Sequence, residues 1–563
     1  MADMANENFI WAGHLIHGLA AGGVTHAVIS PGSRSTPLAL ACLRHPGLKT
    51  WVQVDERSAA FFALGLAKAS RQPVILVCTS GSAPANWFPA VIEADMGMVP
   101  LILLSADRPA ELRDCGANQS IDQAHLFGGH VRAFHELPAA DVRPEMLRYL
   151  RTLAAQVMDQ CRWPLPGPVH VNVPLREPLV PAGPLPPIAE MAPVVVSHPR
   201  LSLPPEECAT LARELAGGKG LIVCGWGEHG PDFPEAIAAL ASKLDCAVLA
   251  DPLSGLRFGS HGRDDLLCRY DAFLRRSSAH ENLRPSWVLR FGAMPVSKAL
   301  QPFLSALPAM PHIVVDACGR WPDPLHLATR LVRADPALLC RQLASGIEAA
   351  APSSWRAAFQ AEELRAAELA RHNAPLEAAV VQAMVDLLPA GGMLFSGNSM
   401  AIRDLDAFSG SSSKPLRIIG NRGASGIDGN VSSALGLAAG GSRPVVALLG
   451  DLAFYHDMNG LLAARGLDVV LVVLNNGGGG IFEYLPQAQL EDFGRAWLTP
   501  LGLDFAHAAG MYGLGYQKIS RAADFPAALA GALAGGAHLI EVTVERDVSV
   551  ALHRAYWMAV AEN

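Results

Sequence analysis

The sequence predicts an α/β protein built from three doubly wound domains with mostly parallel sheets. Short β-rich apolar runs alternate with Ala- and Leu-rich helical segments along all 563 residues. This alternation is typical of parallel sheets that helices cover on both faces. Fifty-two glycines and 42 prolines indicate many tight turns, and half of the residues are hydrophobic, which allows large buried cores.

The expected strands are the apolar runs themselves. In the first third they are THAVIS (25–30), PVILVCTS (73–80), PLILLSAD (100–107) and GPVHVNVP (167–174). The middle third has GLIVCGWG (220–227), CAVLADP (246–252), WVLRFG (287–292) and HIVVDACG (312–319). The last third has GMLFSGN (392–398), LRIIGNRG (416–423), PVVALLGD (444–451), VVLVVLNN (469–476) and HLIEVTVE (538–545).

Two linkers divide the chain into three parts. Residues 177–200 contain seven prolines and predict a stiff surface segment. Residues 344–354 are rich in small side chains and precede the long helical pattern WRAAFQAEELRAAELARH. We therefore expect domains at 1–180, 198–345 and 355–563.

Composition and charge narrow the class of protein. The net charge of −8 argues against nucleic acid as the main partner, because phosphate binding requires a basic face. Ten scattered cysteines without a C-x-x-C pair predict buried free thiols and a cytoplasmic protein. The start, MADMANENFIW, lacks the basic region of a signal peptide, and we expect no membrane span.

Polar side chains follow two apolar runs of the last third. Asp451 ends PVVALLGD, and Asn475 and Asn476 end VVLVVLNN before four glycines. Consecutive parallel strands usually lie close together, so these side chains are expected to face one gap. A carboxylate, an amide oxygen and a backbone carbonyl suit Mg²⁺ and a phosphate-bearing ligand. The alternative is that Asp451 only caps the following helix.

The stretch LRIIGNRGASGIDGNVSSALG allows a rival interpretation. It predicts a strand, a glycine-rich turn and a helix start, with Asp451 at the distance where a dinucleotide-binding unit has its ribose-binding acid. The glycines at 420, 423, 426 and 429 do not follow G-x-G-x-x-G. An NAD-binding protein therefore remains a weaker alternative.

Glu56 lies where a short strand meets a helix in TWVQVDERSAAFFALGLAKAS. A helix N-terminus favours an acid, which explains Glu56 without any function. The functional hypothesis is a partly buried carboxyl group with a raised pKa that exchanges a proton with a bound heterocycle.

These motifs together resemble the thiamine-diphosphate enzymes of the pyruvate-oxidase type. The resemblance is closest to the menaquinone-pathway branch of that family and covers nearly the whole chain, least distinctively in its middle third. The segments that carry it are SPGSRSTPLALA (30–41), VDERSAAFFALGLAKAS (54–70), TSGSAPANWFPAVIEA (79–94), SADRPAELRDCGANQSIDQ (105–123), GNSMAIRD (397–404), GNRGASGIDG (420–429) and NNGGGGIFEYLP (475–486).

The resemblance implies a pyrimidine-binding, a central and a diphosphate-binding domain, in that order. It implies that Glu56 contacts the aminopyrimidine ring and promotes its imino tautomer. Asp451, Asn476 and the carbonyl of Gly478 would bind Mg²⁺ or Mn²⁺. Ile427 would pack beneath the bent cofactor, and the further implied cofactor contacts are Ser399, Gly426 and Gly450. The wider superfamily has Gly-Asp-Gly where this chain has Gly-Asp-Leu.

In the implied reaction, 2-oxoglutarate is decarboxylated on the cofactor, and the resulting carbanion equivalent adds to the ring of isochorismate in a conjugate addition. Both substrates are dicarboxylates, which arginine binds best by bidentate pairing. Each arginine taken alone is more simply explained as a solvated surface residue. With the matching motifs, the implied catalytic residues besides Glu56 are Ser33, Arg34 and Gln119. The implied substrate-binding residues are Arg108, Lys298, Asn398, Ser399, Arg403, Arg422, Ile481 and Phe482.

The resemblance also implies a homodimer or a dimer of dimers, with the cofactor between subunits. Two further alternatives stay open. One is another thiamine-diphosphate enzyme, such as an acetohydroxyacid synthase or an oxo-acid decarboxylase. The other is a catalytically silent regulatory subunit that binds the cofactor.

Overall fold

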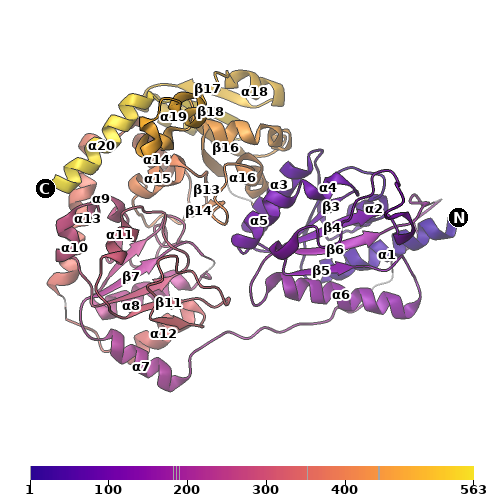
Figure 1. Cartoon of the computed structure of the whole chain (residues 1–563), viewed down its shortest axis with the longest axis horizontal. Coiled ribbons are helices and arrows are strands. Elements are labelled where there is room, and N and C mark those ends of the chain that lie inside the picture. The colour runs from indigo at the N-terminus through magenta and orange to yellow at the C-terminus, as the bar shows by residue number, and fades with distance from the viewer. Residues whose placement is uncertain are drawn as a thin grey trace. The chain divides into compact units, whose positions relative to one another are not determined.

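The computed structural model describes residues 2–181, 183–185, 187–188, 191–227, 229–351, 353–441 and 444–562. Its strands form three six-stranded sheets, and every strand pair with a defined register is parallel (Figure 1). The chain divides into two compact units. Unit 1 comprises Met1–His198, Asn421–Ser442 and Ala453–Val469, and unit 2 comprises Pro199–Gly420, Arg443–Leu452 and Val470–Asn563.

The first sheet lies in unit 1 and has the order β2-β1-β3-β4-β6-β5. Helices α1, α2 and α6 cover one face, and α3 and α5 lie on the other (Figure 1). The central strands are fully buried, which explains their continuous apolar sequences. The bounds are α1 Ala2–Ala21, β1 His26–Ile29, α2 Thr36–Arg44, β2 Lys49–Val52, α3 Glu56–Ser70, β3 Val74–Cys78, α5 Phe88–Met96, β4 Leu101–Asp107, β5 Ala133–Glu136, α6 Pro144–Arg162 and β6 Val169–Pro174.

The second sheet lies in unit 2 and has the order β12-β11-β10-β7-β8-β9. Helices α7, α8 and α12 pack on one face, and α9, α10 and α11 pack on the other. The bounds are α7 Pro205–Leu215, β7 Gly220–Cys224, α8 Phe233–Leu244, β8 Ala247–Ala250, β9 Leu266–Leu267, α9 Tyr270–Phe273, α10 Ser277–Asn282, β10 Trp287–Phe291, α11 Leu300–Ser305, β11 His312–Val315, β12 Arg330–Val332 and α12 Pro336–Gly346.

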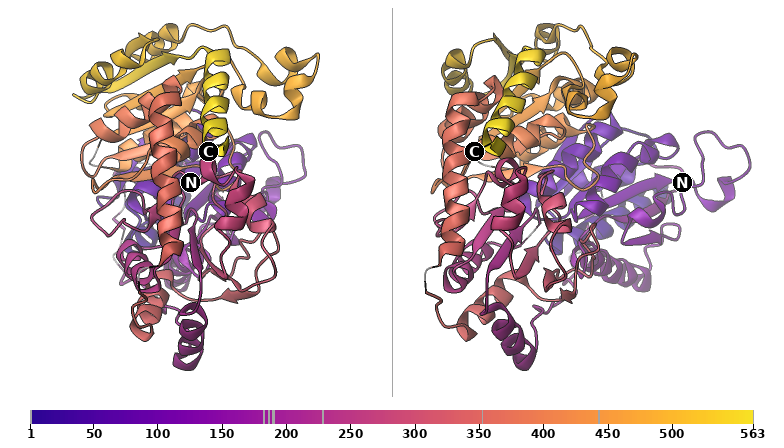
Figure 2. Two further views of the ribbon diagram at one scale, coloured as in Figure 1. Left: turned by 90° about the vertical axis from the view of Figure 1, so that its left-hand side faces the viewer. Right: turned by 60° about the vertical axis from the view of Figure 1, so that its left-hand side comes forward.

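The third sheet has the order β14-β13-β15-β16-β18-β17. A hydrophobic core continues from the second sheet into this one through α13, which runs beside the C-terminal helix α20 (Figure 2). The bounds are α13 Ser354–Asn373, α14 Leu376–Leu387, β13 Met393–Ser396, α15 Met400–Phe408, β14 Arg417–Gly420, β15 Val445–Gly450, α17 Asp451–His456, β16 Val469–Asn475, α18 Phe505–Tyr512, β17 Gly515–Ile519, α19 Phe525–Ala532, β18 Ala537–Thr543 and α20 Arg546–Glu562.

Helix α16 (Asn430–Gly440) belongs to unit 1, where it crosses α3 at very close range. Two glycines make this approach possible. A Cβ atom on Gly65 would lie 2.1 Å from the carbonyl oxygen of Ser433, and one on Gly436 would lie 2.0 Å from that of Phe62. The crossing therefore joins the helix that Glu56 begins to the helix that follows the loop 421–429.

The sequence predictions of the fold are largely confirmed. All thirteen apolar runs contain a strand, and the described residues of 177–200 have no helix or strand. The small-residue linker is narrower than predicted, because α12 continues to Gly346. The predicted ranges 1–180, 198–345 and 355–563 each contain one complete sheet, and the boundaries themselves stay a prediction.

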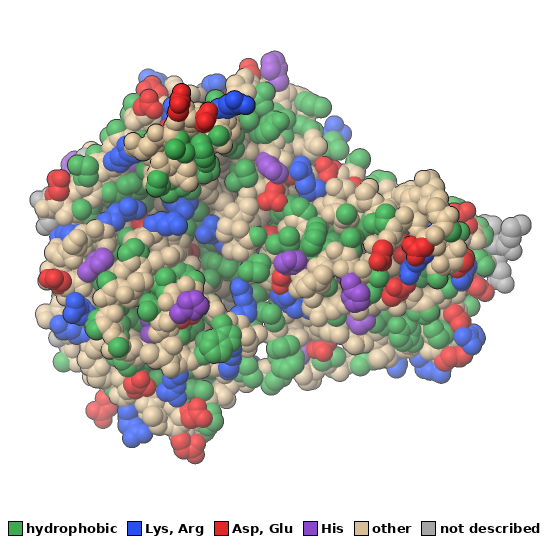
Figure 3. Space-filling model, viewed as in Figure 1, with side chains coloured by type: hydrophobic (Ala, Val, Ile, Leu, Met, Phe, Trp, Pro, Cys, Tyr) green, Lys and Arg blue, Asp and Glu red, His purple; other side chains and the backbone are tan. Residues whose placement is uncertain are grey.

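The cysteines are free thiols, as the sequence analysis predicts. All ten cysteines lie among the described residues and are free thiols, eight of them buried. Of the described helices, none combines the length and the apolar character that crossing a membrane requires. On the face shown in Figure 3, the acidic and basic side chains of the described residues are interspersed.

Candidate functional site

The strands β13, β15 and β16 lie next to one another in the third sheet. The residues that follow them are Asn398 and Ser399, then Asp451, then Asn476. The prediction that Asp451 and Asn476 follow neighbouring strands is therefore confirmed. Parallel strands place these polar groups at one edge of the sheet, where ligands of such folds bind.

The carboxylate of Asp451 is buried, with 3% of the residue exposed. Its Oδ2 accepts a hydrogen bond from the backbone N–H of Gly478 at 2.7 Å, and its Oδ1 accepts one from Leu452 at 2.9 Å. Burial raises the pKa of Asp451 to about 6, although these N–H groups act to lower it. A cation next to this carboxylate would offset the cost of burying its charge.

Asn476 supplies an oxygen that is ready to bind a ligand. Its Oδ1 is buried and has no hydrogen-bond partner. The following glycines have positive φ, 75° at Gly477 and 127° at Gly478, and a Cβ on Gly478 would lie 2.0 Å from the carbonyl oxygen of Leu498. A side chain is therefore excluded where the loop passes Asp451.

These donors fit a hard divalent cation. The buried carboxylate of Asp451 and the unpartnered amide oxygen of Asn476 are oxygen ligands of the kind that Mg²⁺ prefers. Among the described residues no cluster of three or more His, Cys, Asp or Glu side chains could hold a metal. Asp451 and Asn476 as a metal site therefore stay a prediction, which the chemistry of their oxygen atoms fits.

Ser399, the N-cap residue just before α15, has a strained backbone conformation with φ 67° and ψ −124°. The guanidinium of Arg403 donates to the Ser399 carbonyl at 2.5 Å and holds this turn from within the helix. Non-glycine residues with positive φ concentrate at ligand sites, where the surrounding structure supports the strain. Asn398 beside it is buried, with 3% exposed.

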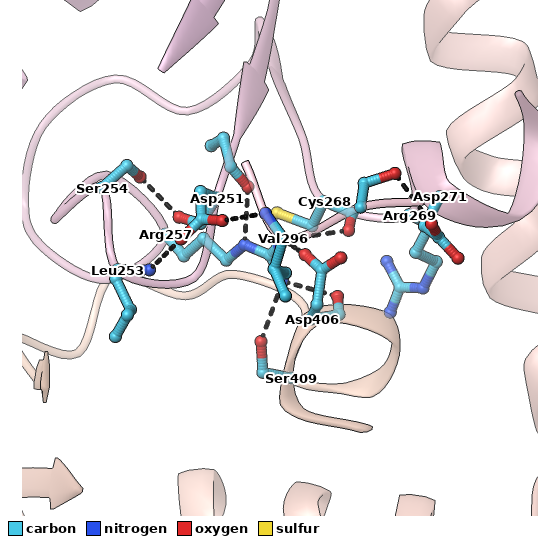
Figure 4. Close-up of polar contacts among 12 residues, drawn as sticks. Asp251, Leu253, Ser254, Arg257, Cys268, Arg269, Asp271, Val296, Asp406 and Ser409 are labelled. Atoms are coloured by element: carbon cyan, nitrogen blue, oxygen red, sulfur yellow. Dashed lines mark hydrogen bonds and ion pairs between the residues drawn. The ribbon is translucent and has the colours of Figure 1, made fainter. Parts of the chain in front are cut away.

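A buried ion pair fixes the other end of α15. Arg257 reaches from the loop after β8 to Asp406 and donates to its backbone carbonyl at 2.7 Å and to its carboxylate (Figure 4). The same guanidinium donates to Ser409 Oγ at 3.1 Å. Breaking such a pair leaves an uncompensated buried charge, so the helix that carries Ser399 is held firmly.

The loop that carries Lys298 is anchored by two aspartates. Asp251 accepts from the N–H of Val296 at 2.9 Å, and Asp271 accepts from Ser297 Oγ at 2.7 Å and from the N–H of Lys298 at 2.9 Å. The side chain of Lys298 remains exposed. Its backbone is therefore fixed while its ammonium group can meet a ligand.

In unit 1, Arg34 and Arg108 lie on the loops that follow β1 and β4. Arg34 is buried and pairs with Glu177 at 2.8 Å. Arg108 donates to Ser80 Oγ, and Gln119 donates to the Ser80 carbonyl at 3.0 Å. Burial and, second to it, the charge of Arg34 lower the pKa of Arg108, while the charges of Asp107 and Glu177 act to raise it. The neighbouring Ser33 is exposed.

Glu56 is the first residue of α3, as the sequence predicts. Asp55 caps the helix by accepting from the N–H of Arg57 at 2.9 Å and of Ser58 at 3.3 Å, so the Glu56 side chain is not the cap. Burial raises the pKa of Glu56, and the charge of Asp55 adds to the rise. This is the environment that the proton-exchange hypothesis requires.

The glycine-rich segment 420–429 connects β14 to α16. Ile427 in this segment is 37% exposed, although Asn421 and Asn430 on either side of it in the sequence are almost fully buried.

The sheet topology disfavours NAD binding, because a dinucleotide-binding unit places its acid on a strand beside the glycine loop. Here β13 separates β14 from β15, which precedes Asp451.

Each unit contains some of the residues that the sequence analysis predicts for the functional site. Unit 1 contains Ser33, Arg34, Glu56, Arg108, Gln119, Arg422, Gly426 and Ile427. Unit 2 contains Lys298, Asn398, Ser399, Arg403, Gly450, Asp451, Asn476, Gly478, Ile481 and Phe482, the last two half-buried in the turn 480–484. Sequence reasoning missed the bridging role of Ser80 and the buried acid Glu93, whose only signal is its place among apolar residues.

Comparison with known proteins identifies the class of enzyme to which this chain belongs. Thiamine pyrophosphate enzyme models match in three consecutive ranges: the N-terminal TPP binding domain at 11–126, the middle domain at 206–396 and the C-terminal TPP binding domain at 407–542. A solved benzoylformate decarboxylase from Polynucleobacter necessarius shares the fold, with a TM-score of 0.71 and 18% identity over 95% of this chain and 98% of that one. Fold and site together define a thiamine-diphosphate enzyme.

Two curated relatives narrow the class. The 2-succinyl-5-enolpyruvyl-6-hydroxy-3-cyclohexene-1-carboxylate synthase of Geobacillus kaustophilus is 49% identical over 99% of both chains. The synthase of the same name from Dechloromonas aromatica is 47% identical over 96% of this chain and 99% of its own. The chain belongs to the family of these 2-succinyl-5-enolpyruvyl-6-hydroxy-3-cyclohexene-1-carboxylate synthases.

Proposed function

We propose that this chain is a transferase of menaquinone biosynthesis. It decarboxylates 2-oxoglutarate and joins the remaining succinyl carbon to the ring of isochorismate, giving 2-succinyl-5-enolpyruvyl-6-hydroxy-3-cyclohexene-1-carboxylate and CO₂. The observation that carries this proposal is similarity over nearly the whole chain to synthases of that name. Bound thiamine diphosphate supplies the carbanion chemistry that both steps need.

Asp451, Asn476 and the Gly478 carbonyl would hold Mg²⁺ or Mn²⁺. The support is the buried carboxylate with a raised pKa beside an unpartnered amide oxygen. The ion would offset part of the negative charge of Asp451 and of the diphosphate. Ser399, Gly426, Ile427 and Gly450 are the further proposed cofactor contacts.

Glu56 is the proposed proton-exchange group at the pyrimidine ring of the cofactor. The Glu56 side chain is half-buried and its pKa is raised, so its carboxyl group retains more readily the proton that it would share with the ring. The helix cap beside it belongs to Asp55, which leaves the Glu56 carboxyl group available.

The cationic residues would bind the carboxylates of the two substrates. Arg34 and Arg108, with Ser33 and Gln119, come from the loops that follow β1 and β4 in unit 1, and Arg34 already pairs with Glu177 at 2.8 Å. Arginine side chains bind a dicarboxylate strongly in a partly desolvated site. The remaining proposed substrate contacts are Lys298, Asn398, Ser399, Arg403, Arg422, Ile481 and Phe482.

We also propose a homodimer or a dimer of dimers, with the cofactor held between subunits as the family resemblance implies. A cytoplasmic location is proposed because ten free cysteines suit a reducing compartment. The alternative activity is that of another thiamine-diphosphate enzyme, such as an acetohydroxyacid synthase. Arg34 and Arg108 favour dicarboxylates over small neutral acceptors.

The test is turnover with thiamine diphosphate and Mg²⁺, following CO₂ release and product mass. We expect product from 2-oxoglutarate only when isochorismate is present. Consumption of pyruvate but not of 2-oxoglutarate would exclude the proposed activity.

Glu56→Gln tests the catalytic assignment. The variant should lose at least about 100-fold in turnover, because a positioned acid or base contributes about that much, and it should still bind the cofactor. Glu145→Gln is the matched control, since Glu145 is also in the first turn of a helix but is exposed. Wild-type turnover by Glu56→Gln would contradict the role.

A further inference from the structure

A buried glutamate near the end of α5 lies where its own helix does not stabilise a negative charge. Glu93 is 3% exposed and lies in the last turn of the helix, where the helix dipole disfavours a carboxylate. Burying an ionised carboxylate is costly unless other groups compensate it. Its partners must therefore come from outside the helix.

Those partners are three consecutive backbone amides of the glycine-rich segment. Glu93 Oε1 accepts from the N–H of Gly423 at 2.8 Å, and Oε2 accepts from the N–H groups of Ala424 at 2.7 Å and Ser425 at 3.4 Å. The ammonium of Lys68 lies 3.7 Å from the carboxylate. All of these residues belong to unit 1, and about 330 positions separate Glu93 from the segment.

The geometry of the segment depends on this contact. A Cβ on Gly423 would lie 2.5 Å from the Glu93 carbonyl oxygen, so the two backbones touch. Ser425 has φ 63°, a left-handed conformation that costs free energy for a non-glycine residue. Two residues further on, Ile427 is exposed although its backbone follows directly from this clamped stretch.

We propose that Glu93 is a positioning residue for the glycine-rich segment 420–429, which we call the cofactor loop. Its carboxylate holds the amides of 423–425, and this fixes Gly426 and Ile427 in the shape that receives thiamine diphosphate. The inference rests on the proposed function for the identity of the ligand. It adds a residue on α5 that does not itself touch the cofactor.

Glu93→Gln should loosen the loop without removing it. A neutral amide offers one acceptor oxygen, and its NH₂ group faces N–H donors that then have no acceptor. The ordered loop becomes a smaller fraction of the population, and the apparent affinity for the cofactor falls by that fraction. We expect the Kd of thiamine diphosphate to rise about 10- to 100-fold, with kcat at saturating cofactor within about threefold of wild type.

The experiment has two readouts on the full-length protein. Hydrogen exchange of the amides 423–428 without cofactor reports the anchor itself. Fluorescence titration with thiamine diphosphate and Mg²⁺, together with kcat at saturation, reports its consequence. Asp95→Asn is the matched control, because Asp95 is an acid on the same helix that pairs with Arg132 and His130 instead.

A second variant approaches the anchor from the other side. In Gly423→Ala the new methyl group displaces the loop from Glu93, so the same two readouts should change. The double variant should weaken binding by much less than the product of the two single effects, because both remove one contact.

Faster exchange at 423–428 with weaker cofactor binding in Glu93→Gln, and with neither change in Asp95→Asn, supports the proposal. Unchanged exchange overturns the anchor, and faster exchange with unchanged affinity overturns the positioning role. Equal loss of affinity in Asp95→Asn also overturns it, because general destabilisation then suffices. A wild-type protein that binds no thiamine diphosphate defeats the proposed function instead, and the positioning role falls with it.

Discussion

Replacing Asp451 with asparagine separates the stability of the cofactor-free protein from its function. Burial raises the pKa of this carboxyl group from 3.8 to about 6. Each pKa unit corresponds to about 1.4 kcal/mol, so the ionised carboxylate costs the folded state about 3 kcal/mol. Because the folded pKa lies above the unfolded one, this cost is absent below pH 4, grows between pH 4 and 6 and is complete at pH 8.

Asp451→Asn removes the charge but also spoils one hydrogen bond. The new NH₂ group must face the N–H of either Leu452 or Gly478, and an unsatisfied buried donor costs about 1–3 kcal/mol. At pH 8 we therefore expect the cofactor-free variant to be as stable as wild type, or up to about 2 kcal/mol more stable. At pH 5 Asp451 of the folded wild type is mostly protonated, and the stability difference should shift against the variant by about 1–2 kcal/mol.

The assay is urea unfolding of cofactor-free protein at pH 8 and pH 5, repeated with thiamine diphosphate and Mg²⁺. Ligand at about 100 times Kd should add about 2.7 kcal/mol to the wild type, and almost nothing to Asp451→Asn. A variant that is several kcal/mol less stable at both pH values would refute the argument that burial of this charge is costly. A variant that gains as much from the cofactor as wild type would refute the role of Asp451 as a metal ligand.

Two further predictions concern packing and pH. Gly65→Ala should destabilise unit 1 by about 1–3 kcal/mol in urea unfolding, because its Cβ would meet the backbone of α16 at 2.1 Å. Gly531→Ala, in open space on α19, should instead gain about 0.5–1 kcal/mol, and equal losses in both variants would contradict the packing argument. For His553, burial acts to lower the pKa, but the hydrogen bond and charge of Asp404 at 3.0 Å outweigh it and the pKa is raised. The stabilisation is complete below pH 6.5 and is lost as the pH rises through the raised pKa, so the Tm advantage of wild type over His553→Gln should shrink from pH 6 to pH 9, and a constant difference would argue against this ion pair.

The central strands were predictable because parallel sheets bury them on both faces. Runs such as VVALL before Asp451 carry this burial in their composition, and all thirteen predicted runs contain a strand. The edge strands β5, β9, β12 and β17 were missed. The exposed faces of β5, β12 and β17 permit polar residues such as His135, Arg330 and Lys518, and β9 has only two residues, too few to leave a pattern. The helix start at Glu56 was also readable, since caps and first-turn acids are local signals.

The sequence by itself determined the α/β class, the buried strands and the polar residues that follow them, because burial on both faces and strand-end chemistry leave local patterns. Only the tertiary structure decided that β15 lies beside β16 but not beside β14, which brings Asp451 near Asn476 and disfavours NAD binding. It also decided that Glu93 anchors a segment about 330 positions away. Strand order and such distant contacts follow from how the elements pack, and a local pattern contains no record of which surface will meet which.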